Sequence, residues 1–336
     1  MPTAPAPYTI PMALVRGLLE GVCARGRTPE EWLVEAGIAP ELLARESARV
    51  STDQYIALFR LLIERLDDET VGLLARPLKR GSLQLLAESA LRGADFAAGL
   101  RRICNVMSLL QDDLELELLT EDSIAGIAVR LARAECRPRF LHELMVRITW
   151  RLAAWLAGGS LPAIRFDFAF DRPHYAEQYG LTFPAPARFG QPHSAFWFDA
   201  RRLARPMLRD DAALRAFVAS WPAALIVPRR GNEGIATRVR AHLQHTRPRW
   251  PALTETAAAL HMSAPTLQRQ LAVVGTSFQA LKDELRRDIA IVRLTVSNDS
   301  LAKIAETLGF ADSAAFQRAF KSWTGSPPGK YRRAAT

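Results

Sequence analysis

The last third of the chain contains the same pattern of apolar and polar residues twice, about 48 residues apart. In each copy three apolar residues recur at positions i, i+4 and i+7, which places them on one face of a short helix. An apolar pair four residues apart then predicts a second helix with its own buried face. The first copy has Leu253, Ala257, Leu260, Leu267 and Leu271, and the second has Leu301, Ala305, Leu308, Phe316 and Phe320.

The residues between the two helices of each copy favour a tight turn. Gly309 suits the left-handed conformation that ends a helix, and His261 has the matching place in the first copy. Ser263 and Asp312 are good N-caps for the second helices, because their side-chain oxygens can accept free backbone N–H groups. Pro265 falls in the first helical turn, where a missing N–H costs nothing.

A longer helix is predicted between the two copies, over Phe278–Val296, because apolar residues such as Leu281, Leu285 and Ile289 recur at helical spacing. Nineteen residues at a rise of 1.5 Å each give about 28 Å. That length is close to the ~34 Å between successive major-groove faces of a duplex. A rigid spacer of this length could hold two helices in adjacent major grooves on one side of the DNA.

The first two thirds of the chain predict helices and a few strands. We expect an α+β domain with a small sheet flanked by helices. The expected helices are Ala13–Arg25, Pro29–Ala36, Thr52–Leu66, Leu83–Arg92, Phe96–Leu109 and Phe140–Leu156, and the expected strands are Leu114–Leu119, Ile124–Leu131, Ile164–Phe170 and Ala195–Phe198.

The excess of positive over negative charge lies entirely in the last third of the chain. The 336 residues suit two domains, and we place the boundary after Pro228, giving domains 1–228 and 229–336. The first domain contains 27 basic and 27 acidic residues, whereas the second contains 17 basic and 8 acidic residues and so carries the whole net charge of +9. Polyanion binding is the usual reason for such segregation; a merely solvated basic surface is the alternative.

The outward face of the second helix carries a Gln-Arg pair at the same place in both copies. Arg can donate two hydrogen bonds to guanine, and Gln can pair with adenine. In one copy ordinary helix surface would be the simpler interpretation, but the repetition favours DNA recognition. The residues on or beside this face are Pro265, Gln268, Arg269, Ser313, Ala314, Gln317 and Arg318, and the phosphate-contact candidates are Ser263, Thr266, Lys321 and Lys330.

Residues 234–333 resemble the DNA-binding domain of the AraC/XylS family of bacterial transcription regulators. The likeness is strongest in Ile304-Ala-Glu-Thr-Leu-Gly-Phe310, Phe316-Gln-Arg-Ala-Phe320 and Gly325-Ser-Pro-Pro-Gly-Lys330-Tyr331-Arg332. The resemblance implies an all-α domain of two helix-turn-helix units, about 253–274 and 301–323, joined by the long helix. It also implies double-stranded DNA as a partner, with base contacts from the seven outward-facing residues named above.

The first copy departs from the family pattern at three positions. Ala252 replaces the capping residue that Ser300 supplies in the second copy, a loss of about 1 kcal/mol. Thr256 stands in the core position of Ile304, and His261 replaces the turn glycine. The first unit is therefore expected to be softer, or to read its half of the DNA site mainly by shape.

Residues 166–210 resemble the effector domain of ornithine-utilisation regulators within the same family. The likeness lies in the spacing of Tyr179-Gly180, Phe189-Gly190 and Leu203-Ala-Arg-Pro206. It implies a sensing and dimerising domain distinct from the sugar-binding cupin of the arabinose regulator. The expected partners are a small-molecule effector, RNA polymerase and a second copy of the chain.

The sequence gives little support for an enzyme or a membrane protein. Zincin, nucleophile-elbow, P-loop and Rossmann motifs are missing from the sequence, and we expect no catalytic residue, cofactor or metal site. Asp112-Asp113 and Asp210-Asp211 are expected at turns or helix ends. Cys23, Cys104 and Cys136 are too scattered for a disulfide framework. Because the chain also lacks a signal peptide and a long apolar run, we expect a soluble cytoplasmic protein.

Two aromatic-rich groups are candidates for an effector pocket, although filling the core is the simpler interpretation of each. They are His142, Met145, Trp150 and Trp155, and Phe166, Phe168, Phe196 and Trp197. Together these features predict a sequence-specific transcription regulator that acts as an effector-responsive activator. The alternative function is a non-specific architectural DNA-binding protein.

Overall fold

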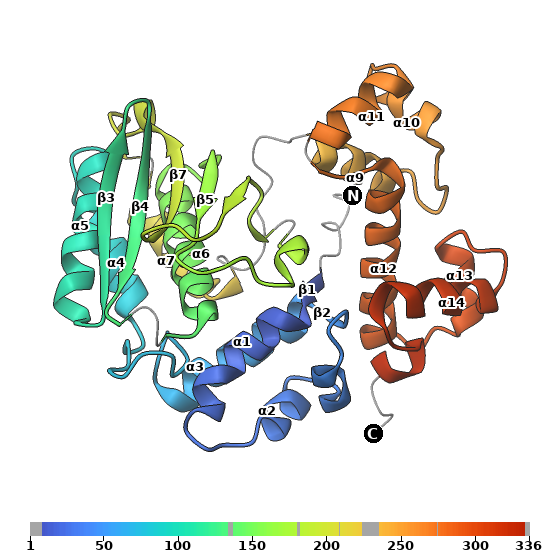
Figure 1. The fold of residues 1–336 in the computed structure, drawn as a ribbon, viewed down its shortest axis with the longest axis horizontal. Helices are drawn as coiled ribbons and strands as arrows, with labels where there is room; N and C mark the ends of the chain where they lie inside the picture. The colour runs from blue at the N-terminus through green and yellow to red at the C-terminus, as the bar shows by residue number, and fades with distance from the viewer. Residues whose placement is uncertain are drawn as a thin grey trace. The chain divides into compact units, whose positions relative to one another are not determined.

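The computed structural model describes residues 9–133, 137–179, 182–207, 209–223, 235–273 and 275–332 (Figure 1). They fall into two compact units, each built from separate stretches of the chain. The first unit lies within Met1–Val15, Leu33–Tyr55 and Glu233–Thr336, and the second lies within Arg16–Trp32 and Ile56–Asn232. The predicted boundary after Pro228 falls outside the described residues and stays a prediction.

A five-stranded sheet forms one layer of the second unit, in the order β3-β4-β7-β5-β6. Its strands are β3 (Leu114–Glu121), β4 (Ile124–Leu131), β5 (Arg165–Asp167), β6 (Ala187–Arg188) and β7 (Ser194–Asp199). All neighbours are antiparallel except β5 and β6, which are parallel. Leu114 and Leu116 are buried whereas Glu115 is exposed, because successive side chains of a strand point to opposite faces.

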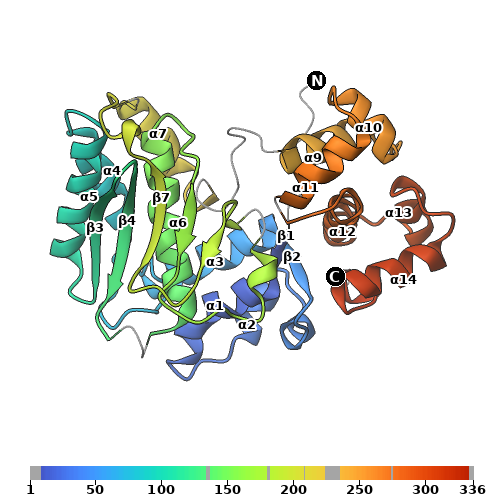
Figure 2. The ribbon, with the colours of Figure 1, turned by 45° about the horizontal axis from the view of Figure 1, so that its top comes forward.

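Helices cover one face of this sheet. The helices with residues in this unit are α1 (Met12–Cys23), α2 (Glu30–Glu35), α3 (Thr52–Leu66), α4 (Ser82–Leu91), α5 (Phe96–Leu110), α6 (Arg139–Leu156) and α7 (Asp211–Ala219). Helix α5 contacts β3, α6 contacts β4 and β7, and α4 contacts both helices, so α5 and α6 lie on the same side (Figure 2). Helix α6 is buried along nearly its whole length, as expected of a helix that is apolar on most sides.

The expected α+β architecture with a small sheet is confirmed, with differences in the short elements. Strand β4 has the predicted bounds, but β5 is shorter than the predicted Ile164–Phe170. Its apolar alternation continues beyond Asp167, whereas its pairing with β7 ends there. Strands β1, β2 and β6 were not predicted, since alternation is not recognisable over two or three residues. Helix α7 was not predicted either.

The first unit is mainly helical and is organised around one long helix. Its helices are α9 (Ile235–His245), α10 (Leu253–Ala259), α11 (Ala264–Val273), α12 (Phe278–Val296), α13 (Leu301–Thr307) and α14 (Ser313–Thr324), with 3₁₀ turns η1 (Pro40–Ala44) and η6 (Pro328–Tyr331). Helix α12 has the predicted bounds and contacts α9, α14 and η6, while α9 contacts α10 and α11 (Figure 1). The buried residues Leu281, Leu285 and Ile289 form the apolar face of α12.

Two short strands from the beginning of the chain also belong to this unit. Strand β1 (Thr9–Pro11) pairs antiparallel with β2 (Arg49–Ser51), and both contact α12. The three residues of each strand are all buried. The helical unit is therefore completed by segments that precede α12 by more than 200 residues.

Candidate DNA-binding interface

The helix pair α10–α11 is built around a small apolar core. Leu267 and Leu271 of α11 are fully buried. Ser263 caps α11, since its Oγ accepts a hydrogen bond from the backbone N–H of Thr266 at 3.3 Å. His261 lies in the turn with φ of 59°, the left-handed conformation that ordinarily favours glycine. The backbone therefore makes the predicted turn at a histidine, where the second copy has Gly309.

The second pair, α13–α14, repeats this construction with stronger caps. Ser300 accepts from the backbone N–H of Lys303 at 3.1 Å, and Asp312 accepts from that of Ala315 at 2.7 Å. Gly309 lies between the two helices with φ of 72°. Phe316 and Phe320 are fully buried in α14, as their spacing predicted.

Two departures in the first pair have visible consequences. At Ala252 no side chain can cap α10, but the Glu255 carboxylate accepts from the Ala252 backbone N–H at 2.9 Å and pairs with Arg249. Thr256 is fully buried, and its hydroxyl has no hydrogen-bond partner within the described part of the chain. The first pair thus retains half of a capping box and buries an unsatisfied polar group.

The candidate DNA-contacting side chains lie mostly on the surface. Pro265, Gln268, Arg269, Ala314, Gln317, Arg318, Ser263, Lys321 and Lys330 are exposed, and Ser313 and Thr266 are half-buried. Gln268 and Arg269 lie together on α11, and Gln317 and Arg318 on α14. Among the described residues, Arg269, Arg318, Lys321 and Lys330 form no ion pair.

An aromatic and cationic cluster, not predicted from the sequence, connects the two helix pairs. The Arg286 guanidinium of α12 lies 4.9 Å from the ring centre of Trp250 and 5.1 Å from that of Phe310. Trp250, which precedes α10, donates from Nε1 to the carbonyl of Thr307 in α13 at 3.3 Å. A Cβ at Gly309 would lie only 2.8 Å from the Trp250 ring. Gly309 is thus required for its backbone conformation and for this close approach.

The aromatic-rich groups proposed for an effector pocket are buried in the core of the second unit. Three of them have protein partners for a polar side-chain atom: His142 Nδ1 lies 2.9 Å from Ser194 Oγ, and the indoles of Trp150 and Trp197 donate to Leu161 and Asp167. The simpler interpretation, that these residues fill the core, agrees with this geometry. Gly180, which belongs to the neighbouring resemblance, and Cys136 lie outside the described residues.

A cavity of about 430 Å³ lies elsewhere in this unit. It is bordered by residues of α3, the start of α4 and the end of α7, among them Arg60, Glu69, Arg80, Phe217 and Trp221. Burial raises the pKa of Glu69 to about 7, even though its carboxylate accepts backbone hydrogen bonds from Leu83 and Gly81. This site was missed, because its residues come from distant segments.

The acidic pairs singled out in the sequence have structural partners. Asp112 pairs with Arg76, Asp113 pairs with Arg137, and Asp210 caps α7. Within the described ranges, no group of three or more His, Cys, Asp or Glu is arranged to hold a metal ion. No helix described by the structure has the length and apolar character needed to cross a membrane.

Comparisons with known proteins give the family. Residues 26–207, more than half of the chain, match a family model described as the arabinose-binding domain of AraC transcription regulators. Residues 256–334 match a helix-turn-helix domain.

The sequence similarity to two known regulators extends over nearly the whole of this chain and of theirs. The ornithine utilization regulator of Pseudomonas aeruginosa is 29% identical over 97% of this chain and 96% of its own. The regulator VirS of Mycobacterium tuberculosis is 25% identical over 91% of each chain. The solved structure of the regulator CdpR from Pseudomonas aeruginosa covers 95% of this chain and 98% of its own at 21% identity, with a TM-score of only 0.32.

The relatives named here are transcription regulators, and the matched models pair an effector-type domain with a DNA-binding domain. The chain therefore belongs to the AraC family and is a sequence-specific DNA-binding transcription regulator.

Proposed function

We propose that α10–α11 and α13–α14 are two helix-turn-helix units, over about 253–274 and 301–323, and that α11 and α14 enter adjacent major grooves. The observation that carries this proposal is the exposed Gln-Arg pair at the same place on both helices. Helix α12, with 19 residues, is about 28 Å long, which suits the ~34 Å separation of successive major-groove faces.

The proposed contacts divide into those that read bases and those that hold the backbone. Base contacts are assigned to Pro265, Gln268, Arg269, Ser313, Ala314, Gln317 and Arg318, and phosphate contacts to Ser263, Thr266, Lys321 and Lys330. Pro265 offers no hydrogen bond, and we assign it to apolar contact with a base.

Regulation is proposed to come from the region 1–228, which would bind a small-molecule effector and pair with a second copy, with the second unit holding the effector. The cavity of about 430 Å³ in the second unit is within the size range of small-molecule sites. An effector acts by binding the DNA-competent state more tightly than the other state. The output we propose is activation through contact with RNA polymerase, with no enzymatic step. The family model is named for arabinose and one relative for ornithine. Because the two names differ, we propose neither compound as the effector of this chain.

Selection from random duplex DNA by the full-length protein tests this function. We expect an enriched site with two half-sites about 10–10.5 base pairs apart, bound at least ~10³ times more tightly than random DNA. Repeating the selection with candidate metabolites identifies the effector as the compound that changes the enrichment. A ratio near one would instead support a non-specific architectural protein.

A further inference from the structure

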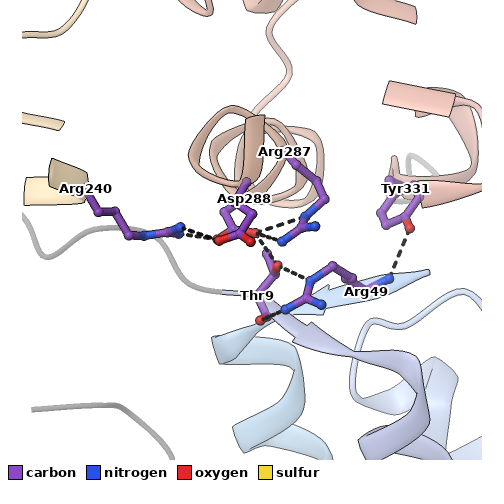
Figure 3. Close-up of polar contacts among 7 residues, drawn as sticks. Thr9, Arg49, Arg240, Arg287, Asp288 and Tyr331 are labelled. Carbon is purple, nitrogen blue, oxygen red and sulfur yellow. Dashed lines mark hydrogen bonds and ion pairs between the residues drawn. The ribbon is translucent and has the colours of Figure 1, made fainter. Parts of the chain in front are cut away.

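The carboxylate of Asp288, on α12, is buried at the meeting point of several segments (Figure 3). Its Oδ2 forms an ion pair with Arg240 of α9. Its Oδ1 accepts a hydrogen bond from the hydroxyl of Thr9 in β1 at 2.5 Å and a longer one from its neighbour Arg287 at 3.3 Å. One carboxylate thus joins α12 to α9 and to the first strand of the chain.

The contact continues from Thr9 into β2 and the end of the chain. The Thr9 hydroxyl accepts a hydrogen bond from Nε of Arg49 at 2.8 Å, while Nη2 of Arg49 donates to the Thr9 carbonyl at 2.6 Å. The backbone N–H of Arg49 donates to the hydroxyl of Tyr331 in η6 at 3.3 Å. Thr9 therefore uses its hydroxyl both as donor, toward Asp288, and as acceptor, from Arg49.

The charges around Asp288 explain why an acid is stable there. Burial alone would raise its pKa, but Arg240, Arg287 and Arg49 outweigh burial and keep the pKa below the ordinary value of an Asp. A buried ion pair of this kind contributes little net stability compared with apolar packing, but it favours one arrangement of the groups that it joins. The cluster is therefore suited to fixing a position.

The segments around Asp288 connect the first helix pair, α10–α11, to the second, α13–α14. Helix α9 contacts α10, α11 and α12, whereas α14 and η6 contact α12 directly. Asp288 lies where α9 meets α12 and where β1 and β2 pack on α12. Strands β1 and β2 also run directly into α1 and α3, which begin at Met12 and Thr52.

We propose that the strand pair β1–β2 is a working part of the DNA-reading unit, in which Thr9 and Asp288 act as positioning residues. They fix α9 on α12 and thereby the spacing between α11 and α14. This inference rests on the proposed function, in which those two helices read adjacent half-sites. Because β1 and β2 continue into α1 and α3, a displacement at the start of either helix reaches Asp288 through Thr9.

The test uses the full-length protein and the DNA site selected by the wild type. Affinity is measured on a duplex with both half-sites, on duplexes with one half-site scrambled, and on duplexes with one or two base pairs inserted between them. For Asp288→Asn and Thr9→Val we expect the two-site to one-site ratio to fall about tenfold, a change of ~1.4 kcal/mol. We also expect both variants to accept a wider range of spacings between the half-sites. Their affinity for duplexes with a single half-site should stay within about twofold of the wild-type affinity.

Asp112→Asn is the control. It makes the same chemical change in an exposed ion pair of the second unit, where Asp112 pairs with Arg76 and lies outside the Asp288 cluster. We expect its two-site to one-site ratio and its spacing preference to equal those of the wild type.

Several outcomes would overturn the inference. An equal loss on all duplexes, with lower thermal stability, would give Asp288 a purely structural role. An effect of Asp288→Asn without one of Thr9→Val would remove the strands from the mechanism. If both variants keep the wild-type ratio, this inference alone fails. If the wild type itself has no preference for two-site DNA, the proposed function fails first and this inference with it.

Discussion

Arg318 and Lys321 lie about one turn apart on α14, and both are exposed. Neither forms an ion pair within the part of the chain that the structure describes. The two side chains differ in what they can recognise. A guanidinium can donate two hydrogen bonds to one guanine, whereas an ammonium acts on phosphate as a point charge. We therefore expect Arg318 to determine base preference and Lys321 to contribute affinity for any sequence.

Replacing each residue by alanine separates these contributions. For Arg318→Ala we expect a loss of about 1–3 kcal/mol at the selected site and a relaxed preference at one base pair. For Lys321→Ala we expect weaker binding to every duplex and a salt slope smaller by about one. The measurement is binding to selected and random duplexes over a range of salt concentrations.

Either variant can contradict its assignment. If Arg318→Ala weakens selected and random DNA equally and keeps the base preference, Arg318 does not read a base. If Lys321→Ala leaves the salt slope unchanged, Lys321 does not contact phosphate.

At the scale of elements, the two helix pairs share a backbone plan but differ in the quality of their cores. Thr256 in α10 and Ile304 in α13 occupy matching positions, and both are fully buried. The Thr256 hydroxyl has no hydrogen-bond partner in the described ranges, and a buried polar group without a partner costs about 1–3 kcal/mol. The first pair is therefore expected to be the less stable one.

Thr256→Val removes this hydroxyl while keeping the shape of the side chain. We expect the free energy of unfolding to rise by about 1 kcal/mol, measured by urea unfolding of the full-length protein. The matched control is Ile304→Thr, which introduces the same hydroxyl in the second pair and should lower stability. An unchanged or lower stability of Thr256→Val would mean that the hydroxyl is satisfied in solution.

The elements that could be predicted from sequence are those with enough residues to show a period. Helix α12 and strand β4 have the predicted bounds, because each has a long apolar face. Strands β1 and β2 have three residues each, too few for any period, and their pairing depends on segments brought together by folding. His261 shows the same limit, since its left-handed φ of 59° is imposed by the turn and not by residue preference.

At the scale of the whole molecule, buried carboxyl groups link stability to pH. Oε1 of Glu143 accepts hydrogen bonds from the Tyr175 and Tyr179 hydroxyls at 2.9 and 2.6 Å. Its Oε2 is buried and has no hydrogen-bond partner among the described residues. Burial is the main cause that raises the pKa of Glu143 to about 7, from 4.5 for an ordinary Glu.

This shift determines the sign of the pH dependence. Between about pH 4.5 and 7 the folded chain holds a proton that the unfolded chain has lost, so the free energy of unfolding falls as pH rises. Glu143→Gln mimics the protonated acid. We expect it to raise the unfolding free energy at pH 8, by at most about 3 kcal/mol, and to flatten the pH profile above pH 4.5. Thermal unfolding of both proteins from about pH 4.5 to pH 8 measures both effects.

Glu69 provides the contrast, since burial raises its pKa to about 7 as well. Both of its oxygens accept backbone N–H groups, from Gly81 and Leu83. In Glu69→Gln the amide NH₂ would oppose one of these donors, so we expect lower stability at pH 8. Equal behaviour of the two variants would contradict the role given to the unpartnered oxygen of Glu143.

The sequence by itself determined the repeated helix pairs, the long helix between them, the segregated positive charge and the family. These features depend on spacing, capping and turn chemistry within a few residues of the chain, and local interactions of this kind are visible in the order of residues. Asp288 also left a local signal, because it lies seven residues after Leu281 on an otherwise apolar helix face.

Only the tertiary structure decided what surrounds that acid. Thr9 and Asp288 are 279 residues apart, and Trp250 and Thr307 are 57 apart. Which distant segments meet depends on the packing of complete elements, so no local pattern specifies that the first strand of the chain completes the helical unit. The physical reason is that a buried charge is stable only where several segments bring partners to it together.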